Sequence, residues 1–364
     1  MDRPNGGSEM NLRQVGETFL AGVKVYAAQG SPLYSALARA GADDEEILAI
    51  ASHGLGAALP VHLFTSAHYL LLGGISDPLA RYFPTLSRDP GPPDEAWPDF
   101  RRFCLEHRDE LLELLRTRTV QMTYVDRCRA LLPPMCIVAD EIGEPLNLIE
   151  IGCSAGVLLT FDRYAYELRD GEHIGPQDAP FTLEGRLTGG PSLRIPEIGS
   201  RIGMDLNLID PKSEEDRRWM LATCFPELLK QQDELAQAME IVAQADIRWM
   251  EGDALVNLPA ALAATEDPVC VYHSACLFYW PKEAKAALED VFLEESRNRV
   301  IYRIGIEPTE KLDDMMSGRE SSGTKNEKEN PAGGETIITR YENGQAEKRI
   351  VAVRNGYSET EWVD

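Results

Sequence analysis

The sequence lacks several patterns that assign a protein to a common class. Its seven cysteines are an odd number, and no two form a C-x-x-C pair, which excludes a zinc knuckle and a thioredoxin-like motif. The first residues lack the apolar stretch of a signal peptide, and no apolar run approaches the ~20 residues of a membrane helix. We therefore expect a cytoplasmic protein, in a reducing compartment, with no membrane partner.

Basic residues are scarce relative to acidic ones. The chain has 36 Lys and Arg against 60 Asp and Glu, a formal net charge of −24. Such a surface repels phosphate backbones, so we expect a small-molecule substrate rather than a nucleic acid. The 364 residues and the hydrophobic fraction of 43% suit a globular protein of two domains. The oligomeric state stays open.

Residues 1–145 have helical patterns and no strong strand candidate, so we expect an all-helical domain there. Residues 61–74 are apolar on nearly all sides, which predicts a buried helix. Residues 99–118 repeat apolar residues at helical spacing and predict a further helix. A helical pattern also surrounds Pro133 and Pro134, and these prolines should kink or split it.

From residue 146 to residue 364, short apolar runs alternate with helical patterns. This alternation predicts an α/β domain with a Rossmann-like, methyltransferase-like sheet that is mostly parallel. A helix is expected at 155–168, directly after the first strand. An insertion is expected at about 171–200 and a mobile loop at about 315–335. The turn at 342–344 joins two alternating runs, which predicts an antiparallel C-terminal hairpin.

The heptapeptide EIGCSAG, at the end of the first predicted strand, allows two interpretations. As G-x-S-x-G, with Gly152, Ser154 and Gly156, it is typical of the nucleophile elbow of a serine hydrolase. Asp253 and His273 follow in the chain order that a catalytic triad of that class needs. However, His273 precedes several further strand candidates, and no His-Gly-Gly segment precedes the motif to form an oxyanion hole.

As E-x-G-x-x-x-G, the same stretch is typical of a cofactor-binding loop. Glu150 can accept hydrogen bonds from a cofactor's amino group, and the glycines let the backbone approach the ligand. The helix expected next would offer unpaired N–H groups to a carboxylate. Neither a G-x-G-x-x-G dinucleotide fingerprint nor a phosphate-binding G-K-[ST] is present.

Polar residues also follow the later predicted strands. A carboxylate after the second strand suits ribose hydroxyls, and both Asp205 and Asp210 qualify for that position. Asp253 follows the third strand, where it can meet an adenine amino group. His273 follows the fourth. Parallel strands place such groups at one edge of the sheet, where open α/β sheets bind ligands.

This series of strand ends resembles the class I S-adenosylmethionine-dependent methyltransferases. The whole chain also resembles an uncharacterised bacterial family, number 2332 among domains of unknown function, in SPLYSALARA, AHYLLLGG, RTVQMTYVDRCRALLP, IEIGCSAG, MDLNLID and YHSACL. The resemblance implies a helical N-terminal region, a methyltransferase-like core and no established substrate. Ser154 replaces the usual middle glycine of the loop. The family's Q-T-N-E-V-G-R is QMTYVDR here, in which Gln121 and Arg127 match.

We therefore expect an enzyme that binds S-adenosylmethionine and methylates a small molecule, with His273 as general base and the helical domain closing over the cleft. The alternatives are a sensor or scaffold that binds the nucleoside without chemistry, and the serine hydrolase. A metal site is not expected, since His62 and His68 do not share a helix face well. The residues proposed to contact the substrate are Gln121, Arg127, His68 and Tyr279.

Overall fold

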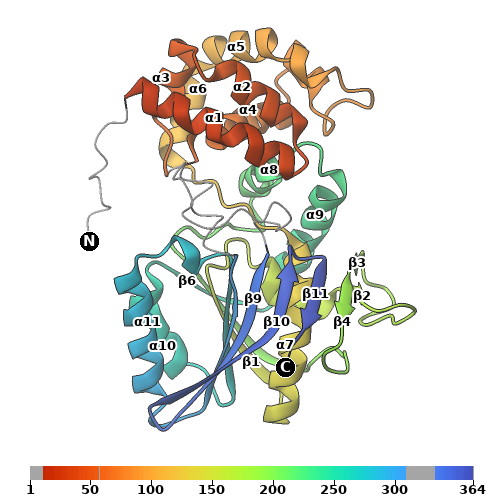
Figure 1. The fold of residues 1–364 in the computed structure, drawn as a ribbon, viewed down its shortest axis with the longest axis vertical. Helices are drawn as coiled ribbons and strands as arrows, with labels where there is room; N and C mark the ends of the chain where they lie inside the picture. The colour runs from red at the N-terminus through yellow and green to blue at the C-terminus, as the bar shows by residue number, and fades with distance from the viewer. Residues whose placement is uncertain (1–10, 57, 309–332, 364) are drawn as a thin grey trace. The chain divides into compact units, whose positions relative to one another are not determined.

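The computed structural model describes residues 11–56, 58–308 and 333–363, drawn in colour in Figure 1. These residues divide into two compact units. The helical unit contains 11–122 and 214–233, and the sheet unit contains the remainder. The division differs in position from the boundary predicted after residue 145. Most of the predicted loop at 315–335 lies outside the described residues.

The helical unit is built from α-helices and short 3-10 helices. Its last α-helix comes from a segment that follows the first strands of the sheet unit in the chain. The elements are α1 (Leu12–Ala28), α2 (Pro32–Gly41), α3 (Glu45–Ala51), α4 (Leu59–Leu72), η1 (Pro78–Tyr82), η2 (Pro93–Glu95), α5 (Trp97–Glu106), α6 (Arg108–Thr117) and α8 (Glu214–Thr223). The helix α9 (Leu229–Gln244) contributes residues to both units.

The core of the helical unit forms around α4, which is buried on nearly every side as its sequence predicts. The ring of Phe64 lies at its centre, 5.8 Å from Phe19 and 5.4 Å from Phe100 in edge-to-face contacts. Tyr34 lies 5.1 Å from Phe64 and 5.7 Å from Phe225. Because Phe225 follows α8, this later segment completes the aromatic core of the unit.

One helix predicted from the sequence is two helices in the structure. The apolar periodicity of 99–118 predicts continuity, but α5 ends at Glu106 and α6 begins at Arg108. At the junction, His107 has a ψ of 31°, and its ring packs 4.5 Å from that of Phe103. The break leaves the apolar faces of both helices in one core.

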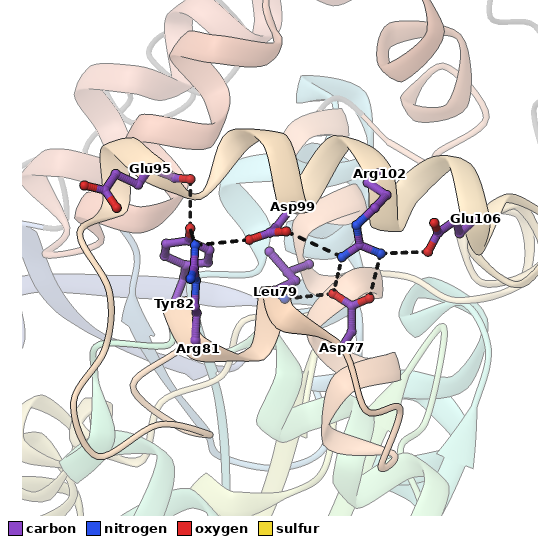
Figure 2. A network of polar contacts seen from close by, with 8 residues as sticks. All are labelled: Asp77, Leu79, Arg81, Tyr82, Glu95, Asp99, Arg102 and Glu106. Carbon is purple, nitrogen blue, oxygen red and sulfur yellow. Dashed lines mark hydrogen bonds and ion pairs between the residues drawn. The ribbon is translucent and has the colours of Figure 1, made fainter.

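A polar network joins the segment before η1 to α5 (Figure 2). Arg102 donates to both carboxylate oxygens of Asp77, at 3.0 and 2.9 Å, and to Glu106 at 2.7 Å. The Leu79 amide donates to Asp77 as well, at 2.7 Å. Burial opposes the ionisation of Asp77, but these hydrogen bonds outweigh burial and lower the pKa of its carboxyl group.

The sheet unit contains a nine-stranded mixed sheet and a separate two-stranded pair, β2 with β3. Its strands are β1 (Leu146–Ile151), β2 (Ala165–Glu167), β3 (Thr182–Glu184), β4 (Arg186–Thr188), β5 (Ile198–Asp205), β6 (Arg248–Glu251), β7 (Val269–Ser274), β8 (Ile301–Ile306), β9 (Gly334–Glu342), β10 (Gln345–Asn355) and β11 (Glu359–Trp362). Its helices are η3 (Val125–Arg127), α7 (Cys128–Ile142), η4 (Val157–Arg163), α10 (Ala254–Ala263), η5 (Leu277–Tyr279) and α11 (Lys282–Glu295).

The strand order is β4-β11-β10-β9-β8-β7-β1-β5-β6. The strands β6, β5, β1, β7 and β8 are parallel, and β8, β9, β10 and β11 then pair antiparallel. The α/β fold class and the C-terminal hairpin are thus confirmed. Asn343 and Gly344 form the predicted hairpin turn, with φ values of 55° and 72°.

Helices cover both faces of the sheet. The helices α10 and α11 pack on one face through Leu258, Leu288 and Phe292, against Ile149 and Val271 of the central strands. The helix α7 packs on the opposite face, with strands β8 and β9. Figure 1 shows α10 and α11 together on one side of the sheet and α7 on the other. This burial on both faces explains why the central strands are apolar without interruption.

One local prediction in this unit is wrong. The helix expected at 155–168 is instead the seven-residue 3-10 helix η4, followed by β2. The Tyr164 hydroxyl donates to the Val157 carbonyl, and the Tyr166 hydroxyl to that of Phe161. Both carbonyls would otherwise accept helical N–H groups. Of the two outcomes predicted for the prolines of α7, the split does not occur, because the helix continues through the buried Pro133 and Pro134, and the kink stays a prediction.

Candidate functional site

The strand order has one topological switch point, between β1 and β7. From β1 the chain continues to β5 and β6 on one side, and from β7 to β8 on the other. At the carboxyl end of β1, Ile151 pairs with Met204 of β5 and with His273 of β7. Open α/β sheets bind ligands outside the carboxyl ends of strands at such a point. The EIGCSAG bend therefore lies where a ligand site is expected.

The bend contains three residues in the left-handed region of backbone conformation. Gly152, Ser154 and Gly156 have φ values of 78°, 51° and 73°. The Gly152 and Cys153 amides donate to the Met204 carbonyl at 2.8 and 3.1 Å, which fastens the bend to the end of β5. A non-glycine residue with positive φ is uncommon, and such residues cluster at functional sites.

Side chains pack closely against both glycines of the bend. A Cβ atom on Gly152 would lie 2.4 Å from the sulfur of Cys276, and one on Gly156 would lie 2.5 Å from the Trp249 ring. Both positions therefore need glycine for packing as well as for backbone conformation. Residues 153–156 are buried and Gly152 is half-buried, so ligand contact near the bend would come mainly from the neighbouring strand ends.

Asp205 ends β5 and contacts the bend directly. One carboxylate oxygen accepts the Ser154 amide at 2.8 Å, and the other accepts the Asn207 amide at 2.9 Å. Asp210, the other candidate for the acid that follows the second strand, lies beyond the strand in an exposed turn, where it accepts the Lys212 amide at 2.9 Å. Of these two acids, Asp205 is therefore the one at the strand end.

Glu150 is 2% exposed. Its neighbours in β1, Ile149 and Ile151, point to the face of the sheet that α10 and α11 cover. Its own side chain accordingly points to the opposite face, where the Tyr272 hydroxyl donates to it at 3.2 Å. Burial raises the pKa of Glu150 well above its usual value, against weaker opposing effects from Tyr272 and Arg127. Glu150 thus lies behind the bend as a buried carboxyl group.

Asp253 begins α10, directly after β6. Its carboxylate accepts the Leu255 amide at 2.9 Å as a helix N-cap, and the residue is exposed. The capping role explains an acid at this position without a ligand. Its exposure leaves the carboxylate accessible to one.

His273 belongs to a polar network on the α11 side of the sheet. Its Nδ1 lies 2.6 Å from Glu307, and its Nε2 accepts a hydrogen bond from Arg303 at 3.1 Å. Arg303 donates in turn to Glu289 and to the Tyr341 hydroxyl. Burial lowers the pKa of His273, Glu307 opposes this effect, and Arg303 adds to it, so that the pKa lies below its usual value. The imidazole is therefore neutral with its proton on Nδ1, and the fold uses both nitrogens, so neither is available as a general base.

Glu307 follows β8 and was missed by the sequence interpretation. Its carboxylate accepts the amides of Cys276, Leu277 and Phe278 at 3.1–3.3 Å, in addition to the His273 contact. Burial opposes ionisation, but these donors lower the pKa of Glu307. Glu307 therefore fixes the loop after β7 at the switch point. The sequence does contain a signal for Glu307, because this acid ends the segment RIGIE after β8 just as Asp205 ends β5.

The residues expected to contact the substrate lie in different surroundings. Arg127 is half-buried in the sheet unit and donates to the Ser274 carbonyl at 3.1 Å, at the end of β7. Tyr279 is 63% exposed in η5. Gln121 and His68 belong to the helical unit. His68 is fully buried there, between the Thr85 hydroxyl at 2.8 Å and the Ala222 carbonyl at 3.3 Å.

The serine hydrolase interpretation needs a histidine beside Ser154. Ser154 is 3% exposed and has the positive φ of an elbow residue. However, Glu307 and Arg303 engage both ring nitrogens of His273, and Asp253 caps α10 instead of orienting that ring. The triad suggested by chain order is therefore not assembled.

A groove of about 1380 Å³ adjoins the His273 network. His273, Arg303, Glu307 and Arg354 line it, together with residues of β9, β10, β11 and α11. Glu150, Asp205, Asp253 and the bend are not part of its lining. The sheet unit thus offers two neighbouring features, the strand ends at the switch point and this groove beside them.

The described residues thus form a Rossmann-like α/β sheet unit and a helical unit. A family model described as "Uncharacterized protein conserved in bacteria (DUF2332)" matches residues 17–362. The chain therefore belongs to this family. No curated protein and no solved structure matches it. Among the residues that the structure describes, no helix is long and apolar enough to cross a membrane.

Proposed function

We propose that the chain binds S-adenosylmethionine at the switch point and transfers its methyl group to a small-molecule acceptor. The observation that carries this proposal is the position of the EIGCSAG bend, at the carboxyl end of β1 where the strand order reverses. Acids end the next two parallel strands or follow them directly, Asp205 after β5 and Asp253 after β6. A series of acids along one sheet edge suits a ligand rich in hydroxyl and amino groups.

An unsatisfied buried group at the same edge supports the fit. The Ser274 side chain ends β7 and is 4% exposed, and its hydroxyl has no hydrogen-bond partner in the described part of the chain. Buried hydroxyl groups without a partner are rare, because leaving one unsatisfied is costly. A polar ligand group at the switch point would satisfy it.

Two residues have the exposure to contact the cofactor directly. The half-buried Asp205 would hold the ribose hydroxyls, and the exposed Asp253 would hold the adenine amino group. Glu150 would act from behind the bend, because its side chain is buried against Tyr272. When bound, the cofactor would supply a methyl group on a positively charged sulfur. The protein would position the acceptor in line with that methyl group, which accounts for about 7–11 kcal/mol at best.

In this proposal, His273 does not remove a proton from the acceptor, so the acceptor's nucleophilic atom must react without a general base at this position. Both ring nitrogens of His273 are engaged, and burial lowers its pKa. The same observation favours the second candidate function, which is binding of the nucleoside by a sensor or scaffold without chemistry. Both functions predict cofactor binding, and they differ in turnover.

A labelled-transfer experiment separates the two functions. Purified protein is incubated with S-adenosylmethionine labelled in its methyl group and with a small-molecule extract of bacterial cells. A labelled product, identified by mass spectrometry, supports methyl transfer. Cofactor that stays bound to the protein and unconverted supports the sensor, and cofactor that does not bind at all contradicts both functions.

A further inference from the structure

Arg354 of β10 is a buried cation that forms no ion pair with an acidic side chain in the described part of the chain. It is 3% exposed, and its guanidinium donates to two main-chain carbonyls, Glu307 at 2.7 Å and Gly356 at 3.4 Å. Its Nε has no hydrogen-bond partner, and no carboxylate forms an ion pair with it, among residues 11–56, 58–308 and 333–363. Buried charges of this kind normally have a paired counter-ion.

A second guanidinium shares the same aromatic ring. Arg354 lies 5.3 Å from the centroid of the Tyr357 ring, and Arg127 lies 5.7 Å from it. Arg127 donates to the carbonyl of Ser274 at the end of β7, and Arg354 to that of Glu307 after β8. The two strands are neighbours in the sheet. Each guanidinium therefore lies near the Tyr357 ring and donates to a main-chain carbonyl at one of two adjacent strand ends.

The acids near this pair also have other partners or are held neutral by burial. Glu307 is held by His273 and three amides, and burial raises the pKa of Glu150, which favours its neutral form. Asp126 lies 3.8 Å from Arg129. Three cations, Arg127, Arg129 and Arg354, therefore face two acids, Glu307 and Asp126, so this cluster has an excess of positive charge although the whole chain has a net charge of −24.

We propose that Arg354 binds a carboxylate group of a small molecule that enters the groove lined by Arg354, while Arg127, which does not line that groove, adds positive charge nearby. A carboxylate accepts two hydrogen bonds from a guanidinium in one plane, and a single negative charge balances the excess. A dianion such as phosphate would bring a second negative charge close to the carboxylate of Glu307, which makes it the poorer fit.

This site also identifies the class of the methyl acceptor, and that step rests on the proposed function. A carboxylate is already the reactive nucleophile, so methylation needs no general base, in agreement with the engaged nitrogens of His273. The carboxylate oxygen forms a bond to the methyl carbon while the carbon–sulfur bond breaks and its electron pair stays on sulfur. No proton moves, and the products are a methyl ester and a neutral thioether.

Titration with benzoate tests the anion site without any cofactor. The wild-type chain is titrated with benzoate, with its uncharged analogue benzamide and with inorganic phosphate, and binding is followed by ligand-observed NMR. We expect benzoate to bind and the other two to bind at least roughly 10-fold more weakly, given the strength of charge-assisted hydrogen bonds. Absence of benzoate binding, or phosphate binding as tightly as benzoate, would overturn the assignment.

Two substitutions locate the binding. Arg354→Gln should weaken benzoate binding roughly 10-fold or more, and Arg354→Lys, which keeps the charge in a buried position, should recover part of it. Arg349→Gln is the matched control, because Arg349 lies in the same strand, pairs with Glu141 and does not line the groove. Circular dichroism checks that Arg354→Gln is folded. If the folded variant bound benzoate as tightly as the wild type, the proposal would be contradicted.

The label from the transfer experiment distinguishes failure of this step from failure of the proposed function. A methyl ester releases labelled methanol in base, whereas a methylated nitrogen or carbon does not. Base-volatile label that is lost in Arg354→Gln supports the carboxylate acceptor. Base-stable label overturns the carboxylate acceptor but leaves methyl transfer intact. No label at all would contradict methyl transfer, and the benzoate titration would still decide the anion site.

Discussion

Asp205 and Asp210 have the same side chain, five residues apart, but different positions at the edge of the sheet. Asp205 contacts the bend through the Ser154 amide, and Asp210 forms an exposed turn with the Lys212 amide. The fold thus shows which of the two acids lies at the strand end. The sequence pattern alone could not, because the insertion before β5 changes the usual spacing between the first and second strands. The distinction depends on where β5 ends, which its register with β1 determines.

This difference predicts unequal effects on cofactor binding. Asp205→Asn should weaken the binding of S-adenosylmethionine by roughly 10-fold or more, because it removes a charged acceptor from the ribose position. Asp210→Asn should leave the dissociation constant within about twofold. Isothermal titration of both variants measures the difference, and an equal or reversed effect would remove Asp205 from the proposed site.

His68 should make stability depend on pH. Burial lowers the pKa of His68 to about 4, below the usual value of about 6.5, so the folded state takes up its proton later than the unfolded state. The unfolded state therefore binds more protons between these two values, and stability falls as the pH falls through this window. From pH 8 to pH 5, this group alone should lower the free energy of unfolding by about 2 kcal/mol.

The variant His68→Asn tests this contribution. It should be less stable than the wild type at pH 8, because Thr85 and Ala222 lose their partner, but its stability should fall by about 2 kcal/mol less on acidification. Urea unfolding at both pH values measures the change. The control is His173→Gln at the surface of the sheet unit, which should keep the wild-type dependence. Equal pH dependence in His68→Asn and the wild type would contradict the account.

At the level of elements, the sequence predicts well where one local signal dominates. Ser31 accepts the Tyr34 amide and Pro32 begins α2, as a cap followed by proline predicts. The hairpin of β9 and β10 follows from Asn343 and Gly344 in the same way. Prediction fails at η4, where the hydroxyl groups of Tyr164 and Tyr166 donate to carbonyls that helical N–H groups would otherwise use, and β2 pairs with β3. No helical period reveals those contacts.

The bend after β1 gives a prediction about packing. Gly156 and Gly143 both have φ values of 73°, but only Gly156 meets a neighbour, the Trp249 ring at 2.5 Å from an added Cβ. Gly143→Ala should therefore cost about 1–2 kcal/mol for the left-handed backbone alone. Gly156→Ala should cost about 1–3 kcal/mol more, because the added methyl group overpacks the site.

Urea unfolding of the two variants compares these costs directly. The difference between them isolates the contact with Trp249, since the backbone conformation is the same. If both variants lost the same stability, the indole ring would be moving aside, and the bend would be looser than its packing indicates. In that case Gly156 would be required for its backbone conformation alone.

At the level of the whole molecule, the division into units could not be derived from the sequence order. The segment 214–233 follows β5 in the chain but belongs to the helical unit, where Phe225 completes the aromatic core. The sequence of this segment does not indicate which core α8 joins. Likewise, Glu307 and His273 are 34 residues apart, and only the pairing of β7 with β8 brings them together.

The most direct measurement is a calorimetric titration of the full chain with S-adenosylmethionine and with its demethylated product. The account predicts that both bind with a dissociation constant below about 1 mM and compete for one site, because they share the adenosine that Asp205 and Asp253 would hold. If neither ligand released or absorbed heat at millimolar concentration, in a protein shown to be folded, the switch point would not be a site for this cofactor.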